Sequence, residues 1–218
     1  MSEETSQRLS RAIDMLRTGS LEEAVQELEN LVKSAPDCIE AWYNLGYAYS
    51  LSDRPEDALI AYDEGLAIDN MIFELWFNKA TVLYEMRDFK AALTCYEKAV
   101  EIRPDDPEAW NNLGNCHSRL GEGKQAIEAY TRAVALKPDY AEAFYNKANA
   151  HFIEGEHERA VAYAEVAVEL DPNLARLVNE WIHVSRAHIA AEQDHKEYEK
   201  RKEKRGPRRF KDLGAQLP

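Results

Sequence analysis

Apolar residues recur along most of the chain at spacings of three and four, which places their side chains on one face of an α-helix. The clearest stretch runs from Pro107 to Tyr140 and predicts two amphipathic helices joined by a tight turn at Gly121. Its apolar and small positions are Trp110, Leu113, Gly114 and His117, then Ala126, Ile127, Tyr130, Ala133 and Val134. Neither helix can bury its apolar face alone, so the pattern indicates a stack of helix pairs.

The same pattern returns with a period of 34 residues and needs no insertion or deletion. Each unit ends in a helix-stopping proline or asparagine, at Pro36, Asn70, Pro104, Pro138 and Pro172. Over residues 1–174 we therefore expect five units, 5–38, 39–72, 73–106, 107–140 and 141–174.

Large and small residues alternate at fixed places in these units. An aromatic residue opens the first helix, at Trp42, Trp76, Trp110 and Phe144, and a small residue follows four places later, at Gly46, Ala80, Gly114 and Ala148. The second helix repeats an alanine and then, in most units, a large residue: Ala24, Ala58, Ala92, Ala126 and Ala160, then Leu28, Tyr62, Tyr96, Tyr130 and Ala164. This alternation predicts helices that interdigitate closely.

Together these residues spell WxxLGxxY, A, Y, A and P, a pattern that resembles the tetratricopeptide repeat from Thr5 to Leu174. The resemblance implies an all-α, right-handed superhelical solenoid whose concave face is lined mainly by the first helix of each pair. The first unit departs most, with Arg8 at the tryptophan position and Arg11 at the leucine position. A terminal repeat with one face in water accounts for that departure.

Local signals predict where helices begin and end. Asp106 can cap a helix that starts at Pro107, and Asp139 with Glu142 has the spacing of a capping box. Glycines at the same place in three units, Gly19, Gly121 and Gly155, predict the turns between paired helices.

After residue 174 the repeat stops, but an apolar helical face continues for about four turns. Its members are Leu177, Val178, Trp181, Ile182, Val184 and Ile189. We expect residues 175–205 to form a capping helix that covers the last unit and then runs on as a charged helix. The Gly206-Pro207 break predicts a disordered tail over residues 206–218.

Composition narrows the partner and the compartment. Of the residues, 45% are hydrophobic and 31% charged, and the formal net charge is −13. This charge disfavours nucleic acid and anionic membranes, except at the basic segment 196–211, which holds nine Lys or Arg against three Glu. The absence of a long apolar run and of a signal sequence, together with three cysteines that form no CxxC pair, favours the cytoplasm.

Candidate chemistry is sparse. The six histidines show no HxxxH or HExxH spacing, and no cysteine lies with them at ligand spacing, so we expect neither a metal nor another cofactor. His117 and His151 share one position of the repeat and are expected to pack. No nucleophile elbow or phosphate loop is present, and the chain is not expected to be an enzyme.

The first helices instead predict a groove that binds a peptide. An asparagine series occupies the sixth position of four successive units, and an amide can pair with both the N–H and the C=O of an extended peptide. Asparagine ladders hold peptide backbones in related repeat proteins, and exposed aromatics beside them supply contact area. The candidate groove residues are Asn44, Asn78, Asn112, Asn146, Asn111, Asn115, Asn149, Tyr43, Tyr47, Phe77, Tyr84, Tyr145 and Phe152.

An acidic series at the second position, Glu40, Glu74, Glu108 and Glu142, constrains the ligand. Related repeats that grip acidic chaperone tails need basic residues where this chain has Leu9, Glu74 and Asn78. We therefore expect a neutral or basic peptide partner rather than a chaperone C-terminus. The alternative is an assembly module that self-associates through its end surface or its charged C-terminal helix.

Overall fold

The computed structural model describes residues 2–205, and all regular secondary structure in that range is helical. The α-helices are α1 (Glu3–Thr18), α2 (Leu21–Ser34), α3 (Ile39–Leu51), α4 (Pro55–Ile68), α5 (Phe73–Glu85), α6 (Phe89–Ile102), α7 (Pro107–Arg119), α8 (Gly123–Leu136), α9 (Ala141–Ile153), α10 (His157–Leu170), α11 (Ala175–Asn179) and α12 (Ile182–Arg205). A short 3-10 turn, Pro172–Leu174, joins α10 to α11.

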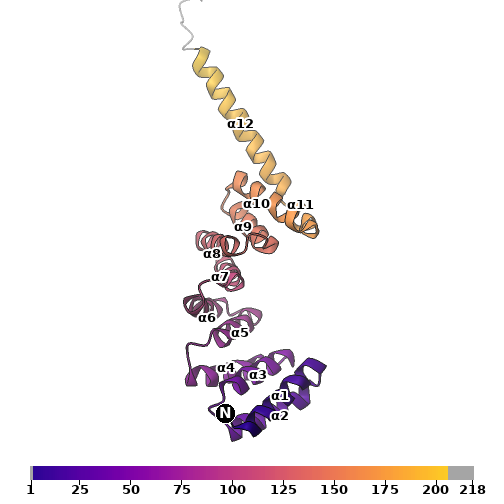
Figure 1. Ribbon diagram of the computed structural model, residues 1–218. Coiled ribbons are helices and arrows are strands. Elements are labelled where there is room, and N and C mark those ends of the chain that lie inside the picture. Colours follow the sequence, from indigo (N-terminus) through magenta and orange to yellow (C-terminus); the bar gives the residue numbers. More distant parts are fainter. Residues whose placement is uncertain (1, 206–218) are drawn as a thin grey trace, which may run out of the picture.

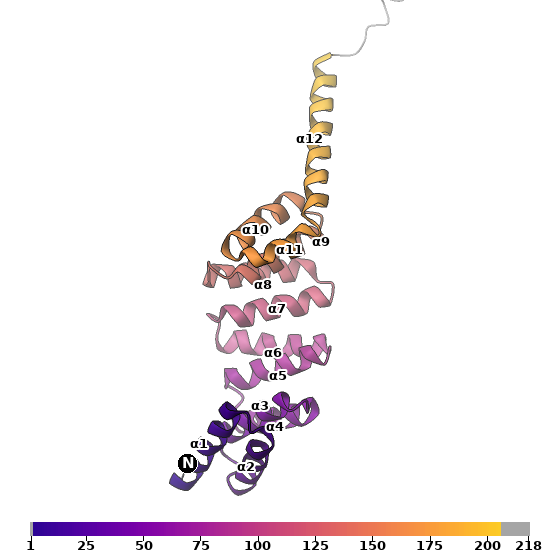
Figure 2. The ribbon, with the colours of Figure 1, turned by 90° about the vertical axis from the view of Figure 1, so that its right-hand side faces the viewer.

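Helices α1 to α10 form consecutive antiparallel pairs that stack along one axis (Figures 1 and 2). The first helices α3, α5, α7 and α9 each begin 34 residues after the one before, at Ile39, Phe73, Pro107 and Ala141. The all-α solenoid expected from the hydrophobic pattern is confirmed.

Two glycines allow the paired helices to touch. A Cβ atom added to Gly46 would lie 2.5 Å from the Tyr62 ring, and one added to Gly114 would lie 2.6 Å from the Tyr130 ring. No real Cβ contact is that short, so the tyrosine occupies the space that the glycine leaves. The close helix approach predicted from the alternation of small and large residues is confirmed here.

The turns within the pairs share one left-handed residue. Gly19, Gly121 and Gly155 adopt φ values of 83°, 78° and 76°. At the same place in the second and third pairs lie Asp53 with φ 56° and Arg87 with φ 64°. A side chain in this region costs about 1–2 kcal/mol relative to glycine, so two of the turns are strained.

Helix starts agree only in part with the predicted caps. Asp106 Oδ1 accepts a 2.8 Å hydrogen bond from the N–H of Ala109, as expected for a helix that opens with Pro107. The capping box predicted from Asp139 and Glu142 is wrong. The N-cap of α9 is Tyr140, which makes no side-chain capping bond.

Each first-helix tryptophan is anchored to the preceding loop. The indole Nε1–H groups of Trp42, Trp76 and Trp110 donate to the carbonyl oxygens of Pro36, Asn70 and Pro104, at 2.8, 2.8 and 2.9 Å. Each bond links a first helix to the residue that ended the unit before it. Phe144 fills the same place in α9 and has no N–H to donate.

Apolar packing changes along the stack. Around α1–α4 the buried core contains Leu28, Leu31, Leu45 and Tyr62, whereas the separate cluster between α8 and α9 consists of Ala126, Tyr130 and Ala150. In α9 the place of Leu45 is taken by Lys147, which is 5% exposed with its Nζ 4.0 Å from the centroid of the Tyr163 ring. The joint near α9 is therefore poorer in large apolar side chains.

The predicted continuous capping helix is interrupted. Glu180 and Trp181 separate α11 from α12, and the apolar face divides there. Val178, Trp181 and Ile182 are buried, with the Trp181 ring stacked 4.9 Å from Phe152, but Leu177 is 40% and Val184 is 36% exposed. Trp181, which lies in the break, packs on the last pair.

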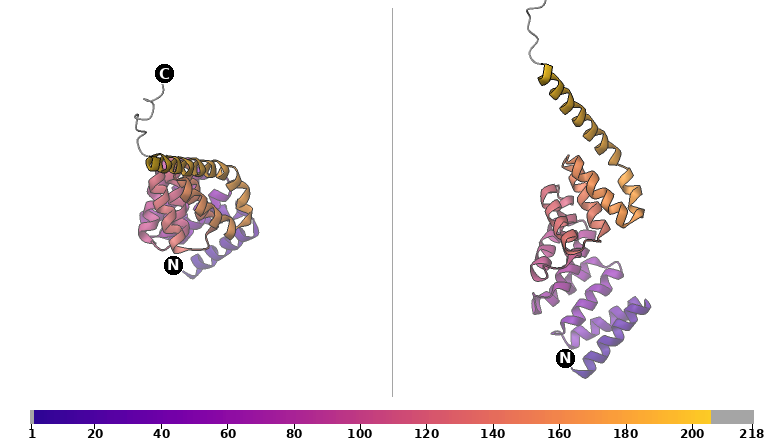
Figure 3. Two further views of the ribbon diagram at one scale, coloured as in Figure 1. Left: turned by 90° about the horizontal axis from the view of Figure 1, so that it is seen from above. Right: turned by 45° about the horizontal axis from the view of Figure 1, so that its top comes forward.

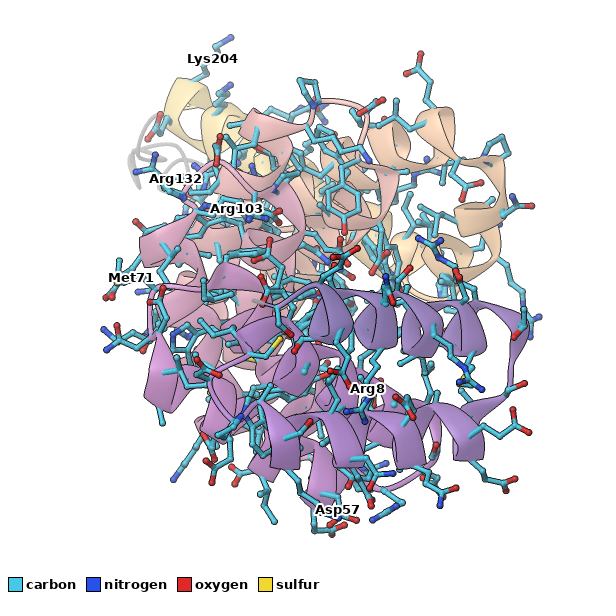
Figure 4. All side chains as sticks on the ribbon, turned by 60° about the horizontal axis from the view of Figure 1, so that its bottom comes forward. Arg8, Asp57, Met71, Arg103, Arg132 and Lys204 are labelled. Carbon is cyan, nitrogen blue, oxygen red and sulfur yellow. The ribbon has the colours of Figure 1, made fainter. Side chains whose placement is uncertain are left out.

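Helix α12 packs against α10 only near its start and then projects away from the stack (Figures 1 and 3). Its 24 residues span about 36 Å at the α-helical rise. Beyond Ile189 its side chains are almost all exposed, with Lys204 near the far tip (Figure 4). Ion pairs such as Arg201 with Glu197 at 3.1 Å lie along it. The tail predicted for residues 206–218 lies outside the described residues.

Within residues 2–205, no helix combines the length and the apolar character needed to cross a membrane.

Candidate functional site

Four of the predicted asparagines form one hydrogen-bonded set between α7 and α9, which we call the amide cluster: Asn111, Asn112, Asn115 and Asn146. Asn146 Nδ2 donates to Asn111 Oδ1 at 3.0 Å and to Asn115 Oδ1 at 3.3 Å. Asn115 Oδ1 also accepts the Tyr130 hydroxyl at 2.8 Å, and Asn115 Nδ2 lies 3.5 Å from Asn112 Oδ1. These contacts fix the orientation of the amides before any ligand arrives.

The asparagines differ in what they can offer a ligand. Asn111 is 1% exposed, so it supports Asn146 and lines no open surface. Asn44 turns to its own helix, where Nδ2 donates to the Glu40 carbonyl at 2.6 Å. Asn78 and Asn149 are half-buried and make no side-chain hydrogen bond within residues 2–205. The predicted series is therefore not one continuous ladder.

A cleft of about 540 Å³ opens beside the amide cluster. It is lined by Tyr84, Asn115, Ser118, Arg119, Tyr130, Glu142, Asn146, Asn149 and Ile153, from helices α5, α7, α8 and α9. Four of these, Tyr84, Asn115, Asn146 and Asn149, are predicted groove residues. The structure brings these four together, while Asn44, Asn78 and Tyr47 lie on α3 and α5 and do not line this cleft.

Arg119 was missed by sequence reasoning. It follows Ser118, the twelfth residue of its unit and the last position included in the predicted groove. Its Nε donates to the Tyr84 hydroxyl at 3.2 Å, and its guanidinium lies 5.9 Å from the centroid of the Phe89 ring. A signal was available, since Arg119 ends α7 on the same side as Asn115 and Asn112, three or four residues apart.

Most of the predicted groove aromatics are partly covered by their neighbours. Phe77 stacks on Phe73 at 5.5 Å and meets the edge of Tyr96 at 5.6 Å. Phe152 is covered by Trp181. The others in this group are Tyr43 and Tyr145, which pack on the first and last apolar clusters, and Tyr84, edge-on to Phe89 at 5.2 Å. Tyr47, at 41%, is the most exposed of the six.

The ninth position of the first helix also serves the fold. Its side chain meets the tyrosine of the paired helix: Thr81 Oγ1 lies 2.9 Å from the Tyr96 hydroxyl, and Asn115 Oδ1 lies 2.8 Å from the Tyr130 hydroxyl. Tyr47 holds this position in α3, and the buried hydroxyl of Tyr62 beside it makes no hydrogen bond of good geometry within residues 2–205. Burial raises the pKa of Tyr62 far above its ordinary value.

The repeated histidines join paired helices. His117 Nδ1 lies 2.7 Å from Glu122, and His151 Nδ1 lies 2.8 Å from Glu156, in each case across the turn that follows the first helix. Burial, the largest effect, lowers the pKa of His151 below 6.5. These are the packing histidines that the sequence predicts.

Chemistry beyond hydrogen bonding is limited in the described part of the chain. No group of three His, Cys, Asp or Glu side chains within it is arranged to hold a metal ion. Cys95 and Cys116 are buried, and burial raises the pKa of the Cys116 thiol to about 12, which keeps it protonated near neutral pH.

Paired helices in a continuous stack, with a polar cleft on the first helices, define an α-helical repeat protein. The recurring Trp, Gly, Ala and Tyr contacts narrow the class further, and a family model of the tetratricopeptide repeat matches residues 9–70, 77–140 and 117–175. The chain belongs to the tetratricopeptide repeat family.

Solved structures share the fold at low sequence identity. MamA (residues 41 to the end) from Desulfovibrio magneticus RS-1 is 24% identical with a TM-score of 0.74, covering 79% of this chain and 98% of its own. YrrB, described as a tetratricopeptide repeat protein with an unusual peptide-binding site, is 21% identical with a TM-score of 0.69, covering 84% of this chain and 90% of its own. A comparison with curated protein sequences gives no significant match.

Proposed function

We propose that the chain is a non-enzymatic protein-interaction scaffold that binds an extended peptide segment of a partner along its first helices. The observation that carries the proposal is the amide cluster beside the 540 Å³ cleft, where amides oriented by hydrogen bonds face an open surface. Amides of this kind pair with the backbone of a peptide whatever its side chains. The described peptide-binding site of YrrB, which has the same fold, supports this function.

The remaining first-helix residues extend this proposed surface beyond the cleft. Asn44 and Asn78 add separate amides on α3 and α5, and Tyr47 offers the most exposed ring among the predicted groove aromatics. We assign the buried Asn111 and the covered Phe77 and Phe152 a supporting role. The proposed setting is the cytoplasm.

The test removes two asparagine side chains of the proposed surface that contribute little to the fold, and compares the result with removal of an asparagine side chain outside that surface. Asn78 makes no side-chain hydrogen bond in the described chain, and Asn112 only the 3.5 Å contact with Asn115. Asn78→Ala with Asn112→Ala should therefore weaken partner capture from native extract about tenfold or more, while the thermal midpoint stays within a few degrees. Asn30→Ala, at an exposed position of α2, is the matched control.

Capture is quantified by mass spectrometry of the recovered proteins. If the double variant retains the same partners at the same recovery as wild type, the groove function is refuted.

An assembly role is the second candidate, because the C-terminal end leaves Leu177 and Val184 exposed and extends α12 into solvent with Tyr198 62% exposed. Such surface suits contact with a second copy. Mass measurement in solution over a hundredfold range of concentration distinguishes the two functions. A monomer at every concentration excludes the assembly role.

A further inference from the structure

The cleft beside the amide cluster has one positive and one negative side chain. Of its nine lining residues, only Arg119 and Glu142 are charged. The others offer amides, hydroxyls and the exposed side chain of Ile153. A ligand that fills this cleft therefore meets opposite charges at two fixed places.

The guanidinium of Arg119 is held in place but its charge is not neutralised. The Tyr84 hydroxyl accepts a hydrogen bond from the Arg119 Nε–H, and the Tyr84 ring packs edge-on against Phe89. Within residues 2–205 no carboxylate lies within ion-pair distance of Arg119, whereas Arg103, which follows α6, is paired with Glu74 at 2.5 Å. The terminal N–H groups of Arg119 are left to bind an external carboxylate, for which the guanidinium fork is well suited.

The hydrogen bonds of Asn146 set the distance between the two charges. This amide lies between Asn111 and Asn115, so its level on α9 matches the middle of α7. Glu142 comes four residues before Asn146, and Arg119 four residues after Asn115. Because the antiparallel α8 lies between them in sequence, α7 and α9 run in the same direction, and the backbone positions of Arg119 and Glu142 are about ten residues, or about 15 Å, apart along the axis.

An extended peptide advances about 3.3 Å per residue, so about five residues span this distance. We propose that the cleft selects a partner segment with an acidic and a basic side chain about five residues apart. The acidic side chain binds Arg119, the basic one binds Glu142, and Asn149 pairs with the backbone between them. This inference rests on the proposed function and refines the expected neutral or basic ligand into one that carries both charges at a fixed separation.

Selection from a random peptide library tests the inference and requires no identified partner. Phage-displayed dodecapeptides are panned against the full chain, Arg119→Gln and Glu142→Gln in parallel. Wild type should enrich peptides with Asp or Glu about five residues from Lys or Arg. Arg119→Gln should lose the acidic preference alone, and Glu142→Gln the basic preference alone.

Arg132→Gln is the matched control, since Arg132 is exposed on α8, makes no ion pair in the described chain and does not line the cleft. It should enrich the same peptides as wild type. Identical peptides selected by wild type and Arg119→Gln overturn the inference.

Affinity for one selected synthetic peptide gives the quantitative test. Arg119→Gln, or replacement of the peptide's acid by its amide, should each weaken binding about tenfold, and both together little further. Tyr84→Phe removes the hydroxyl that orients Arg119 and should weaken binding about threefold. Additive losses in the cycle contradict the pairing.

The experiments distinguish failure of the groove function from failure of the charge selection. If Asn149→Ala abolishes binding of the selected peptide but Arg119→Gln does not, peptide binding in the cleft stands and the charge selection is wrong. If wild type enriches no peptide, both are refuted. Circular dichroism and thermal melting of each variant show that the fold is retained.

Discussion

Helices α1–α4 and α7–α9 share one repeat geometry but join their neighbours through different chemistry. In the first region, fully buried side chains such as Leu28 and Leu31 fill the space between helices. In the second, Asn111 is equally buried, and its Oδ1 accepts a hydrogen bond from Asn146 on the next first helix. Burial of apolar side chains has no preferred direction, whereas hydrogen bonds between side-chain amides require a defined distance and angle.

This difference shows that the polar face of a repeat protein is not all available to a ligand. Asn111 and Asn146 hold the first helices α7 and α9 in register through a hydrogen bond. Other amides beside them, such as Asn149, remain accessible to a ligand. The residues next to the proposed site therefore contribute to stability as well, and a loss of binding after their mutation needs a stability control.

The largest expected effect lies in the apolar region. Leu28→Ala leaves a cavity in a fully buried cluster and should lower the free energy of unfolding by about 2–5 kcal/mol. Leu136→Ala, at a position of α8 that is 40% exposed, should change it by less than about 1 kcal/mol. Urea denaturation followed by circular dichroism measures both. Equal losses at the two sites would remove the distinction between core and surface leucines.

In the amide region a single substitution should cost less. Asn146→Ala leaves Asn111 Oδ1 buried without its donor and should destabilise by about 1–3 kcal/mol. Asn111→Leu combined with Asn146→Leu removes both partners, so the double variant should be less destabilised than the sum of the single ones. A double-mutant cycle by urea denaturation checks this. Strict additivity would mean that the two amides are not coupled.

The turns sharpen the comparison, because the left-handed residue is strained in the second and third pairs and relaxed in the last two. Arg87→Gly should stabilise by about 1 kcal/mol, since Arg87 holds φ 64°. Gly121→Arg is the reciprocal change, at φ 78° with no atom within 4 Å of an added Cβ, and should destabilise by a similar amount. Thermal midpoints of the two variants should move in opposite directions, and a shift of both in the same direction would contradict the strain.

The smallest effect is expected from pH. Burial lowers the pKa of His151 in the folded chain below 6.5, so the unfolded chain binds a proton first. Stability from this group is complete above pH 6.5 and falls as the pH decreases through and below that value. The bond of Arg159 to Glu156, and then that of His151, lower the pKa of Glu156, whose contribution is lost only below its ordinary 4.5. Between pH 7.5 and 5.5, His151→Gln should therefore flatten the decline of the thermal midpoint. An unchanged slope would exclude His151 as its source.

The sequence predicts the features that recur with the 34-residue period, such as the helix starts. It does not predict which side chains the neighbouring unit covers. The period places helix starts such as Phe73 and Ala141, because it follows from apolar spacing and chain punctuation. It also assigns Asn111 to the open face from its angle on the helix. Whether that angle is covered depends on the next first helix, and Asn146 and Tyr140 lie there.

Dependence on a neighbouring unit also explains why the break between α11 and α12 was not predicted. Spacing alone makes Leu177 to Ile189 one helical face, but in the structure the helix breaks at Glu180 and Trp181, and Trp181 stacks on the ring of Phe152 from α9. The cleft residue Arg119 depends in turn on Tyr84 from the preceding unit, 35 positions away.

The hydrogen bonds donated by the indole N–H groups allow unfolding to be followed by fluorescence. Trp42, Trp76 and Trp110 each report on a different joint, because each indole donates to a carbonyl oxygen in the loop that follows the second helix of the preceding unit. Phe144 shows that this position accepts a ring with no N–H. Phenylalanine can therefore replace two of these three tryptophans, and also Trp181, so that one tryptophan remains to be excited selectively. Such single-tryptophan chains would report by fluorescence the order in which neighbouring units separate during unfolding.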